Sequence, residues 1–301
     1  MSDVAIIVIS YNMGKMLKDC INSLLNQSVT DFRLIIIDDA SSDGTEDILK
    51  GFTDKRINHK KNNKHLGIAA SRNAGIAELK NEKIVFFIDA DCYANSNWLE
   101  EGLNAFISDP SVLAVEGSTT YGGNNYHPRL SEKFYHMDCK PGLFQTHNCA
   151  YKIEVFQQIG GFDEKNFNYS NEDVDFFYRA KKEFPGKKFL VCPNMKVVHQ
   201  VSYWNITKFF KDTYKAKYII RFIKKHGRLD FGSGLLGSFI LSPNNLILGL
   251  FPPLIFIYIL KKHIKISNLY DMLFILLYII KAYHYRFMVW YYALKEKIFV
   301  I

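Results

Sequence analysis

The chain has 301 residues, of which 48% are hydrophobic and 23% charged, and these fractions exclude a globally disordered or fibrous protein. Its net charge of +8 is unevenly distributed, because residues 1–201 carry 23 basic and 26 acidic side chains whereas residues 202–301 carry 15 and 4. Five widely spaced cysteines without a Cys-x-x-Cys pair are typical of a reducing cytosol, not of a disulfide framework. We therefore expect a globular body joined to a basic tail.

Short apolar runs alternate with helical patterns through the first third of the chain. In chain order they predict strand 4–10, helix 13–25, strand 33–37, helix 45–50, an edge-like strand 56–59, helix 68–79 and strand 83–88. Strands that alternate with helices predict an α/β fold with a mostly parallel sheet and right-handed crossovers. Ligands bind such sheets at the carboxyl ends of the strands. Polar clusters occur at those ends in this sequence.

The first cluster is Asp89-Ala90-Asp91, which follows a hydrophobic strand. Two carboxylates one residue apart can hold a hard divalent cation and leave positions for phosphate oxygens. A single Asp-x-Asp is weak evidence, since most instances are loop carboxylates or helix caps. Phosphatases that use Asp-x-Asp as a nucleophile carry it near the first strand, which is not its position here.

Two more acidic clusters have both an ordinary and a functional interpretation. Asp38 and Asp39 end a buried strand, where their repulsion is unfavourable, and one of them can accept from a base N–H or a ribose hydroxyl. Ser42 and Asp43, just beyond, are expected to cap the next helix. The run 168–175 leads into a helical pattern, and acidic groups in a first helical turn are commonplace because they suit the helix dipole.

Seven motifs in this order resemble the family 2 inverting glycosyltransferases of GT-A fold. The resemblance extends from residue 4 to about residue 200. It is carried by Val8-Ile9-Ser10-Tyr11-Asn12, the run 38–45, the run 65–75, Asp89-Ala90-Asp91, Gly160-Gly161-Phe162-Asp163-Glu164, Glu172-Asp173 and Val198-His199. Each motif is modest alone, but seven in sequence are very specific.

The resemblance implies a nucleotide diphosphate sugar as donor, bound by four residues. Tyr11 is expected to pack on the base and Asp39 to accept from a ring N–H of it. Arg72 resembles the arginine near the base and diphosphate, and Asp89 is expected near the ribose. UDP is the expected carrier, with dTDP and GDP as alternatives.

The resemblance also implies a metal site and a catalytic base. Asp91 is expected to bind Mn²⁺ or Mg²⁺ across the diphosphate, and His199 to complete the metal shell unless it is a capping or core histidine. Asp173 corresponds to the general base that activates an acceptor hydroxyl, a contribution of ~10²–10⁴-fold, and Glu172 is expected to contact the acceptor. A cation stabilises the charge that develops on the leaving diphosphate. The alternative is a non-catalytic subunit that binds nucleotide sugars.

Residues 134–138 and His147-Asn148 are candidates for the acceptor side, the latter just before an expected helix, although ordinary packing explains them equally well.

The tail divides into a basic aromatic helical segment, 202–231, and a hydrophobic helical region, 232–301. Residues 231–260 carry no charge. This stretch is long enough for a membrane span, but Pro243 and Pro252-Pro253 interrupt it. The second apolar stretch, 272–280, is too short to span a membrane alone. We expect a membrane-seated hairpin or interfacial segment at the cytoplasmic face, acting on a glycan or polyprenyl-linked acceptor of the cell envelope. The alternative is a helical domain packed on a partner. Nucleic-acid binding is not expected, because the basic segment continues into apolar sequence.

Overall fold

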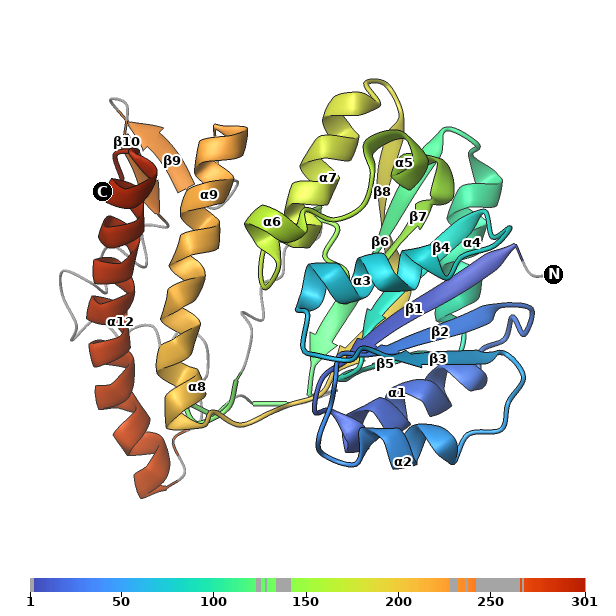
Figure 1. The fold of residues 1–301 in the computed structure, drawn as a ribbon, viewed down its shortest axis with the longest axis horizontal. Helices are drawn as coiled ribbons and strands as arrows, with labels where there is room; N and C mark the ends of the chain where they lie inside the picture. The colour runs from blue at the N-terminus through green and yellow to red at the C-terminus, as the bar shows by residue number, and fades with distance from the viewer. Residues whose placement is uncertain are drawn as a thin grey trace. The chain divides into compact units, whose positions relative to one another are not determined.

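The computed structural model describes residues 3–122, 126–127, 129–133, 142–227, 232–235, 238–241, 266 and 268–300. The candidate acceptor segment 134–138 and most of the uncharged stretch 231–260 lie outside them. The chain divides into two compact units (Figure 1): unit 1 is Met1–Asn124 with His136–Gln200, and unit 2 is Asn125–Tyr135 with Val201–Ile301. From the sequence we expect a catalytic domain over 1–201, and unit 1 differs from this range by the segment 125–135 and by Val201.

Unit 1 is built on an eight-stranded sheet with the strand order β3-β2-β1-β4-β7-β6-β8-β5. The strands are β1 Val4–Ser10, β2 Arg33–Asp38, β3 Ile57–Lys61, β4 Ile84–Asp89, β5 Cys92–Ala94, β6 Val112–Tyr121, β7 Asn148–Lys152 and β8 Lys188–His199. The first four strands pair in parallel, with β3 at the edge as the sequence predicts. The sheet as a whole is mixed, because β7 is antiparallel to β4 and β6, and β5 is antiparallel to β8.

Helices cover both faces of this sheet (Figure 1). They are α1 Gly14–Leu25, α2 Thr45–Lys50, α3 Ile68–Ala77, α4 Trp98–Ser108, α5 Ile153–Ile159, α6 Glu164–Phe167 and α7 Glu172–Glu183. Alternate residues of β1 point to opposite faces: Ile6 and Val8 join the core that includes α1 and α4, and Ala5 and Ile7 join the core that includes α3, α5 and α7. Burial on both faces explains why the strands are continuously apolar.

The strand register brings the polar clusters to one edge of the sheet. Ser10 of β1 lies opposite Asp38 of β2, and Ile9 lies opposite Asp89 of β4. Three parallel strands therefore end together, and the residues that follow them, beginning with Tyr11, Asp39 and Asp91, emerge side by side.

Asn148 begins a strand, β7, where the sequence analysis expects a helix start, and its side chain points into the core of unit 1. It is fully buried. Its Oδ1 accepts from Nε1 of Trp98 at 2.8 Å, and its Nδ2 donates to the carbonyl groups of Ser118 at 2.9 Å and Met195 at 3.1 Å. Asn148 is therefore a structural residue that joins α4 to three strands, not part of an acceptor pocket.

Replacing Asn148 with leucine should lower the free energy of unfolding by roughly 3 kcal/mol. Leucine fills a similar volume but leaves the Trp98 N–H and two carbonyl groups without their partner, and each buried unpaired group costs about 1–3 kcal/mol. Urea unfolding measures the loss. Asn104→Leu on the exposed face of α4 is the matched control, for which we expect little change; equal stability of the two variants would contradict the structural role.

Unit 2 contains α8 Ile206–Lys211, the 3-10 helix η1 Asp212–Lys215, α9 Ala216–His226, the antiparallel strands β9 Gly232–Leu235 and β10 Ser238–Leu241, and α12 Leu269–Glu296. The expected basic helical segment is helical over 206–226. The hydrophobic region differs from a purely helical tail at its start, where β9 and β10 form. Gly232 and Gly234 lie in β9, and glycine is a poor helix former.

Helix α12 lies in the region 232–301 that is expected to be helical, and it extends well beyond the apolar run 272–280 on both sides. The charged residues Asp271, Lys281 and Arg286 do not interrupt it, because they lie on its inner face: Asp271 is fully buried and Arg286 is 7% exposed. Asp271 accepts from Oγ of Ser131 at 2.7 Å and pairs with Arg129 at 3.2 Å. The segment 129–133 is thereby built into unit 2.

Candidate active site

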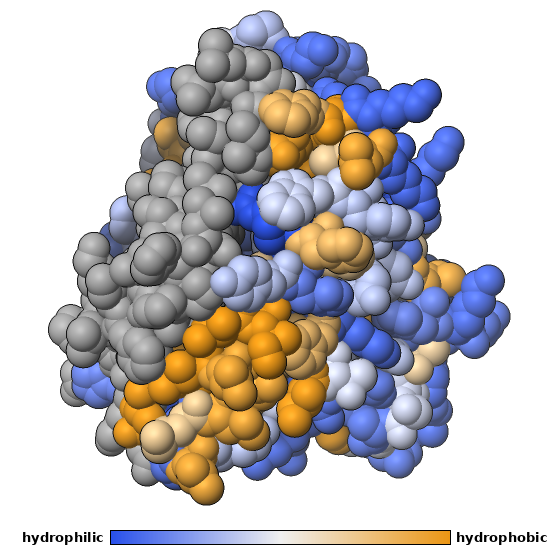
Figure 2. All heavy atoms as spheres, turned by 90° about the vertical axis from the view of Figure 1, so that its left-hand side faces the viewer, coloured by the Kyte–Doolittle hydropathy of each residue, from blue (hydrophilic) through white to orange (hydrophobic). Residues whose placement is uncertain are grey.

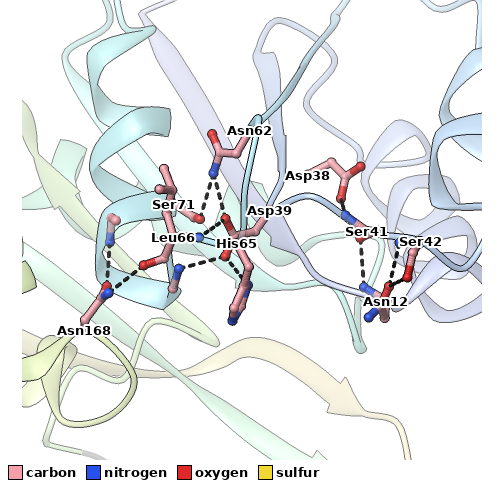
Figure 3. A network of polar contacts seen from close by, with 12 residues as sticks. Asn12, Asp38, Asp39, Ser41, Ser42, Asn62, His65, Leu66, Ser71 and Asn168 are labelled. Atoms are coloured by element: carbon pink, nitrogen blue, oxygen red, sulfur yellow. Dashed lines mark hydrogen bonds and ion pairs between the residues drawn. The ribbon is translucent and has the colours of Figure 1, made fainter.

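Asp39 is the centre of a hydrogen-bonded network at the end of β2 (Figure 3). Its carboxylate is buried and accepts from the Asn62 side chain at 2.9 Å, from the N–H groups of Leu66 and Gly67 at 2.8 Å each, and from Nδ1 of His65 at 2.8 Å. Burial alone would raise the pKa of Asp39, but these donors hold it below its usual value. Three N–H donors and the His65 ring thus surround the carboxylate of Asp39.

His65 makes both contacts that the sequence analysis assigns to a nucleobase. Its ring stacks on Tyr11, with centroids 3.9 Å apart and planes at 23°, while its Nδ1 faces Asp39. Tyr11 is 43% exposed, and Tyr169 lies on the other side of His65 at 5.7 Å. The structure thus brings Tyr11 and Asp39 together as expected. It adds His65, which the sequence analysis noted only as part of a motif, between them.

The turns that carry these residues are tightly constrained. The Asn12 N–H donates to Oγ of Ser41 at 2.8 Å, and Oδ1 of Asn12 accepts from the Ser42 N–H at 2.8 Å (Figure 3). Asn12 and Ala40 both adopt positive φ, at 55° and 62°. Non-glycine residues in this region are strained by about 1–3 kcal/mol and cluster at functional sites. The loops after β1 and β2 are therefore held in one defined arrangement.

Arg72 links β4 to the start of α7. It is 4% exposed on α3, and its guanidinium donates to Oδ1 of Asp89 at 2.9 Å and to Oε1 of Glu172. Glu172 is itself 4% exposed. The Arg72 guanidinium thus lies between the carboxylates of Glu172 and Asp89. The expected roles of Glu172 toward the acceptor and of Arg72 toward the base and diphosphate stay predictions. Both side chains are enclosed because a buried arginine needs anionic partners.

Asp173 is the half-buried neighbour of Glu172 in the first turn of α7. Its Oδ1 accepts from the Val174 N–H at 2.8 Å and its Oδ2 from the Thr146 N–H at 3.3 Å. Burial raises the pKa of Asp173, although Arg72 opposes the change. Burial and the adjacent Asp173 charge raise the pKa of Glu172 to about 7. Two neighbouring carboxyl groups with raised pKa values at one sheet edge are the pattern of an acid–base site.

Asp91 and His199 meet because β5 pairs with the end of β8, which sets Cys92 opposite His199. Nε2 of His199 lies 3.4 Å from Oδ1 of Asp91. Nδ1 of His199 faces the Gln200 carbonyl oxygen at 2.9 Å. These two contacts orient the imidazole ring with Nδ1 toward the Gln200 carbonyl oxygen and Nε2 toward Asp91. An imidazole nitrogen and a carboxylate oxygen converging in this way suit a divalent cation.

Cys92 is near enough to be a third ligand, since its Sγ lies within 4.8 Å of the donor atoms of Asp91 and His199. Burial raises the pKa of Cys92 well above its usual value. The three residues together offer a carboxylate oxygen, an imidazole nitrogen and a sulfur atom within reach of one cation.

A model of the family described as "Glycosyl transferase family 2" matches residues 5–207, which is more than half of the chain. The chain belongs to glycosyl transferase family 2. The match covers unit 1 and each of the residues discussed above. The GT-A fold expected from the sequence is confirmed with it.

Several members of family 2 and several solved glycosyltransferases are similar to this chain. Glycosyltransferase AglE of Haloferax volcanii is 28% identical over 188 residues, which are 59% of this chain and 60% of AglE. The mannosyltransferase PcManGT from Pyrobaculum calidifontis, solved with GDP-Man and Mn²⁺, has a TM-score of 0.58 at 17% identity and is matched over 98% of this chain and 86% of that one. S. aureus TarS 1–349, solved with UDP-GlcNAc, has a TM-score of 0.54 at 19% identity, over 74% and 73% of the two chains.

Proposed function

We propose that this family 2 glycosyltransferase moves a sugar from a UDP-sugar to a hydroxyl group of a glycan or lipid-linked acceptor, with inversion, in the synthesis of a cell-envelope polysaccharide. The observation that carries the proposal is the placement of Asp173. This carboxylate with a raised pKa follows Glu172, whose side chain pairs with Arg72, and Arg72 also pairs with Asp89, two residues before Asp91.

Asp173 is the proposed general base. An acceptor hydroxyl is a poor nucleophile, and a carboxylate that removes its proton during attack raises the rate typically ~10²–10⁴-fold. Attack by the hydroxyl on the face of the sugar opposite the leaving diphosphate inverts the anomeric carbon, so the reaction requires no covalent enzyme intermediate. Because the pKa of Asp173 is raised, this carboxylate becomes protonated at a higher pH than an ordinary aspartate does. When the pH is lowered, we therefore expect kcat/KM to begin to fall at that higher pH.

The donor is proposed to bind along the ends of β1, β2 and β4. Tyr11 offers a ring face to the base, and Asp39 offers an acceptor once His65 moves from it. Asp89, fixed by Arg72, is placed for the ribose. Asp91 and His199 would hold Mn²⁺ or Mg²⁺, which when bound neutralises negative charge on the diphosphate. The complexes of PcManGT with GDP-Man and Mn²⁺ and of TarS with UDP-GlcNAc support this class of donor.

We also propose that unit 2 associates with the cytoplasmic face of a membrane, where a polyprenyl-linked acceptor is accessible. Within the part of the chain that the structure describes, α12 is the one helix long and apolar enough to cross a bilayer. Length and composition alone are weak evidence, since core helices of soluble proteins share both.

Asp91→Asn should weaken Mn²⁺-dependent nucleotide binding at least ~10-fold, because even residues that only support a metal ligand change affinity ~10–100-fold. Thermal shift with UDP-, GDP- and dTDP-sugars, each with and without Mn²⁺, identifies the carrier and measures the effect. Asp47→Asn, an exposed aspartate on α2, is the control. An unchanged Mn²⁺ dependence in Asp91→Asn would remove Asp91 from the metal site. Binding without sugar transfer would favour the non-catalytic subunit.

A further inference from the structure

Helix α12 carries a continuous stripe of exposed apolar side chains along its whole length. Successive members are three or four residues apart, or adjacent, which places them on one face of the helix. The stripe consists of Leu269, Met272, Leu273, Leu276, Ile280, Tyr283, Phe287, Trp290, Tyr291 and Leu294, each between 43% and 81% exposed. At 1.5 Å per residue it is roughly 38 Å long. Figure 2 shows apolar side chains gathered on the face of the molecule that it draws.

The opposite face of α12 is charged and is tied to the rest of unit 2 by ion pairs near its start, middle and end. The pairs are Arg129–Asp271 at 3.2 Å, Asp212–Lys281 at 2.9 Å and Lys224–Glu296 at 2.8 Å. Nζ of Lys281 also lies over the rings of Trp204, at 4.5 Å, and Phe209, at 4.3 Å. The charges are thus fixed on the inner face, and the stripe faces outward over the same length.

These ion pairs argue against α12 as a membrane span. A span needs about 30 Å of helix in hydrocarbon, which would place Lys281, near the middle of α12, at the bilayer centre. A charge there is strongly unfavourable. Asp212 and the helices that pair with α12 would also have to enter the hydrocarbon region. With α12 parallel to the surface, the stripe alone enters the apolar region and all three ion pairs stay on the aqueous side.

The chemistry of unit 2 identifies the surface that fits the stripe. Residues 206–226, on the helices to which α12 is tied, carry seven basic side chains and one acidic one, and Lys208, Lys211 and Lys224 are exposed. An anionic lipid leaflet attracts such cations by ~1 kcal/mol each. Tyr283, Trp290 and Tyr291 within the stripe are of the residue types enriched at the lipid–water interface.

We propose that α12 lies in the plane of an anionic bilayer, with its apolar stripe in the boundary between headgroups and acyl chains and its ion-paired face toward unit 2. This inference rests on the proposed membrane association and specifies its geometry: the chain is held on the membrane by one face of one helix and does not cross it there.

Co-sedimentation with vesicles of phosphatidylcholine and phosphatidylglycerol tests the stripe. Leu276→Gln combined with Phe287→Gln should weaken binding at least ~10-fold, because each side chain loses the burial of a large apolar group. Ile107→Gln, which changes a 74% exposed apolar residue on α4 of unit 1, is the matched control and should bind like wild type. Vesicles of phosphatidylcholine alone should bind more weakly than the mixture.

Tryptophan quenching by brominated lipids tests the orientation. In a Trp290→Phe background, which leaves the partly or fully buried Trp98 and Trp204 as reference, a tryptophan is introduced by Leu273→Trp, Tyr283→Trp or Leu294→Trp. An in-plane helix gives one depth profile for all three positions, with strongest quenching by shallow bromine atoms. Deepest quenching at 283 and shallow quenching at 273 and 294 would overturn the in-plane geometry while leaving membrane association intact.

Two other outcomes are decisive. No binding of the wild-type protein to either vesicle would refute membrane association itself. The proposed sugar transfer is tested independently, by an assay with a soluble acceptor and without lipid. A concentration-dependent dimer in sedimentation velocity that the Leu276→Gln/Phe287→Gln variant abolishes, without lipid binding, would assign the stripe to a second copy of the chain.

Discussion

Asp173→Asn should lower the turnover of sugar transfer ~10²–10⁴-fold, because an amide cannot take the proton of the acceptor hydroxyl. The change is nearly isosteric, and the hydrogen bond that Oδ1 accepts from the Val174 N–H can be retained by the amide oxygen. Donor affinity should be nearly unchanged, since the role proposed for Asp173 concerns the acceptor and not the donor. Product formation from a radiolabelled nucleotide sugar measures turnover, and titration of the same nucleotide measures donor binding.

The control is Asp47→Asn, which removes the same charge from an exposed position in α2 and should leave turnover as it is. The variant should also be stable, and slightly more so above neutral pH, because a raised carboxyl pKa means that ionisation of Asp173 opposes folding. Near wild-type turnover in Asp173→Asn would require another base.

Arg72→Met should lower the free energy of unfolding by about 3–5 kcal/mol at pH 8, since it leaves the buried Glu172 and Asp89 without their shared cation. The loss should be smaller at pH 5. The pKa of Glu172 in the folded protein is about 7, above its value in the unfolded chain. Protonation of Glu172 therefore stabilises the folded protein at low pH, and this stabilisation is lost as the pH rises through 7. Without Arg72 that pKa rises further, and the cost of ionisation grows.

Urea unfolding at the two pH values measures this difference. The double variant Arg72→Met/Glu172→Gln should recover part of the loss at pH 8 and almost none at pH 5, because the glutamine is neutral at both. Lys60→Met breaks the exposed pair with Glu78 and serves as the surface control, for which we expect about 0–1 kcal/mol. An equal loss at both pH values would show that Arg72 acts through packing and not through charge.

The sequence predicts the first half of unit 1 closely because local patterns determine it. Helix α2 has the expected bounds, and β1, β2 and β4 lie within one residue of theirs. The antiparallel insertion of β7 between β4 and β6 depends on pairing between distant segments, and no local pattern indicates it. Helix α12 falls within the hydrophobic helical region expected over 232–301, but its pairing with α8–α9 through Lys281 and Asp212, 69 residues apart, could not be read from local patterns.

The candidate site shows the same limit. The positions of Tyr11, Asp39, Asp91 and Asp173 follow from strand ends and motif order. Their present partners do not: that His65 stacks on Tyr11 while facing Asp39, or that Glu172 turns inward to Arg72, depends on how the loop before α3 and the turn before α7 pack.

The participation of residues 129–133 in unit 2 has a consequence for synthesis on the ribosome. Arg129 and Asp271, which pair, are separated by 142 positions in the chain. At the usual elongation rate of 5–20 residues per second, about 7–28 s pass between the appearance of the two. During that interval the strands of the sheet can assemble, whereas the early segment waits for its partner. Translation pauses or truncations late in the message should therefore leave unit 1 folded while the segment 129–133 lacks its partner Asp271.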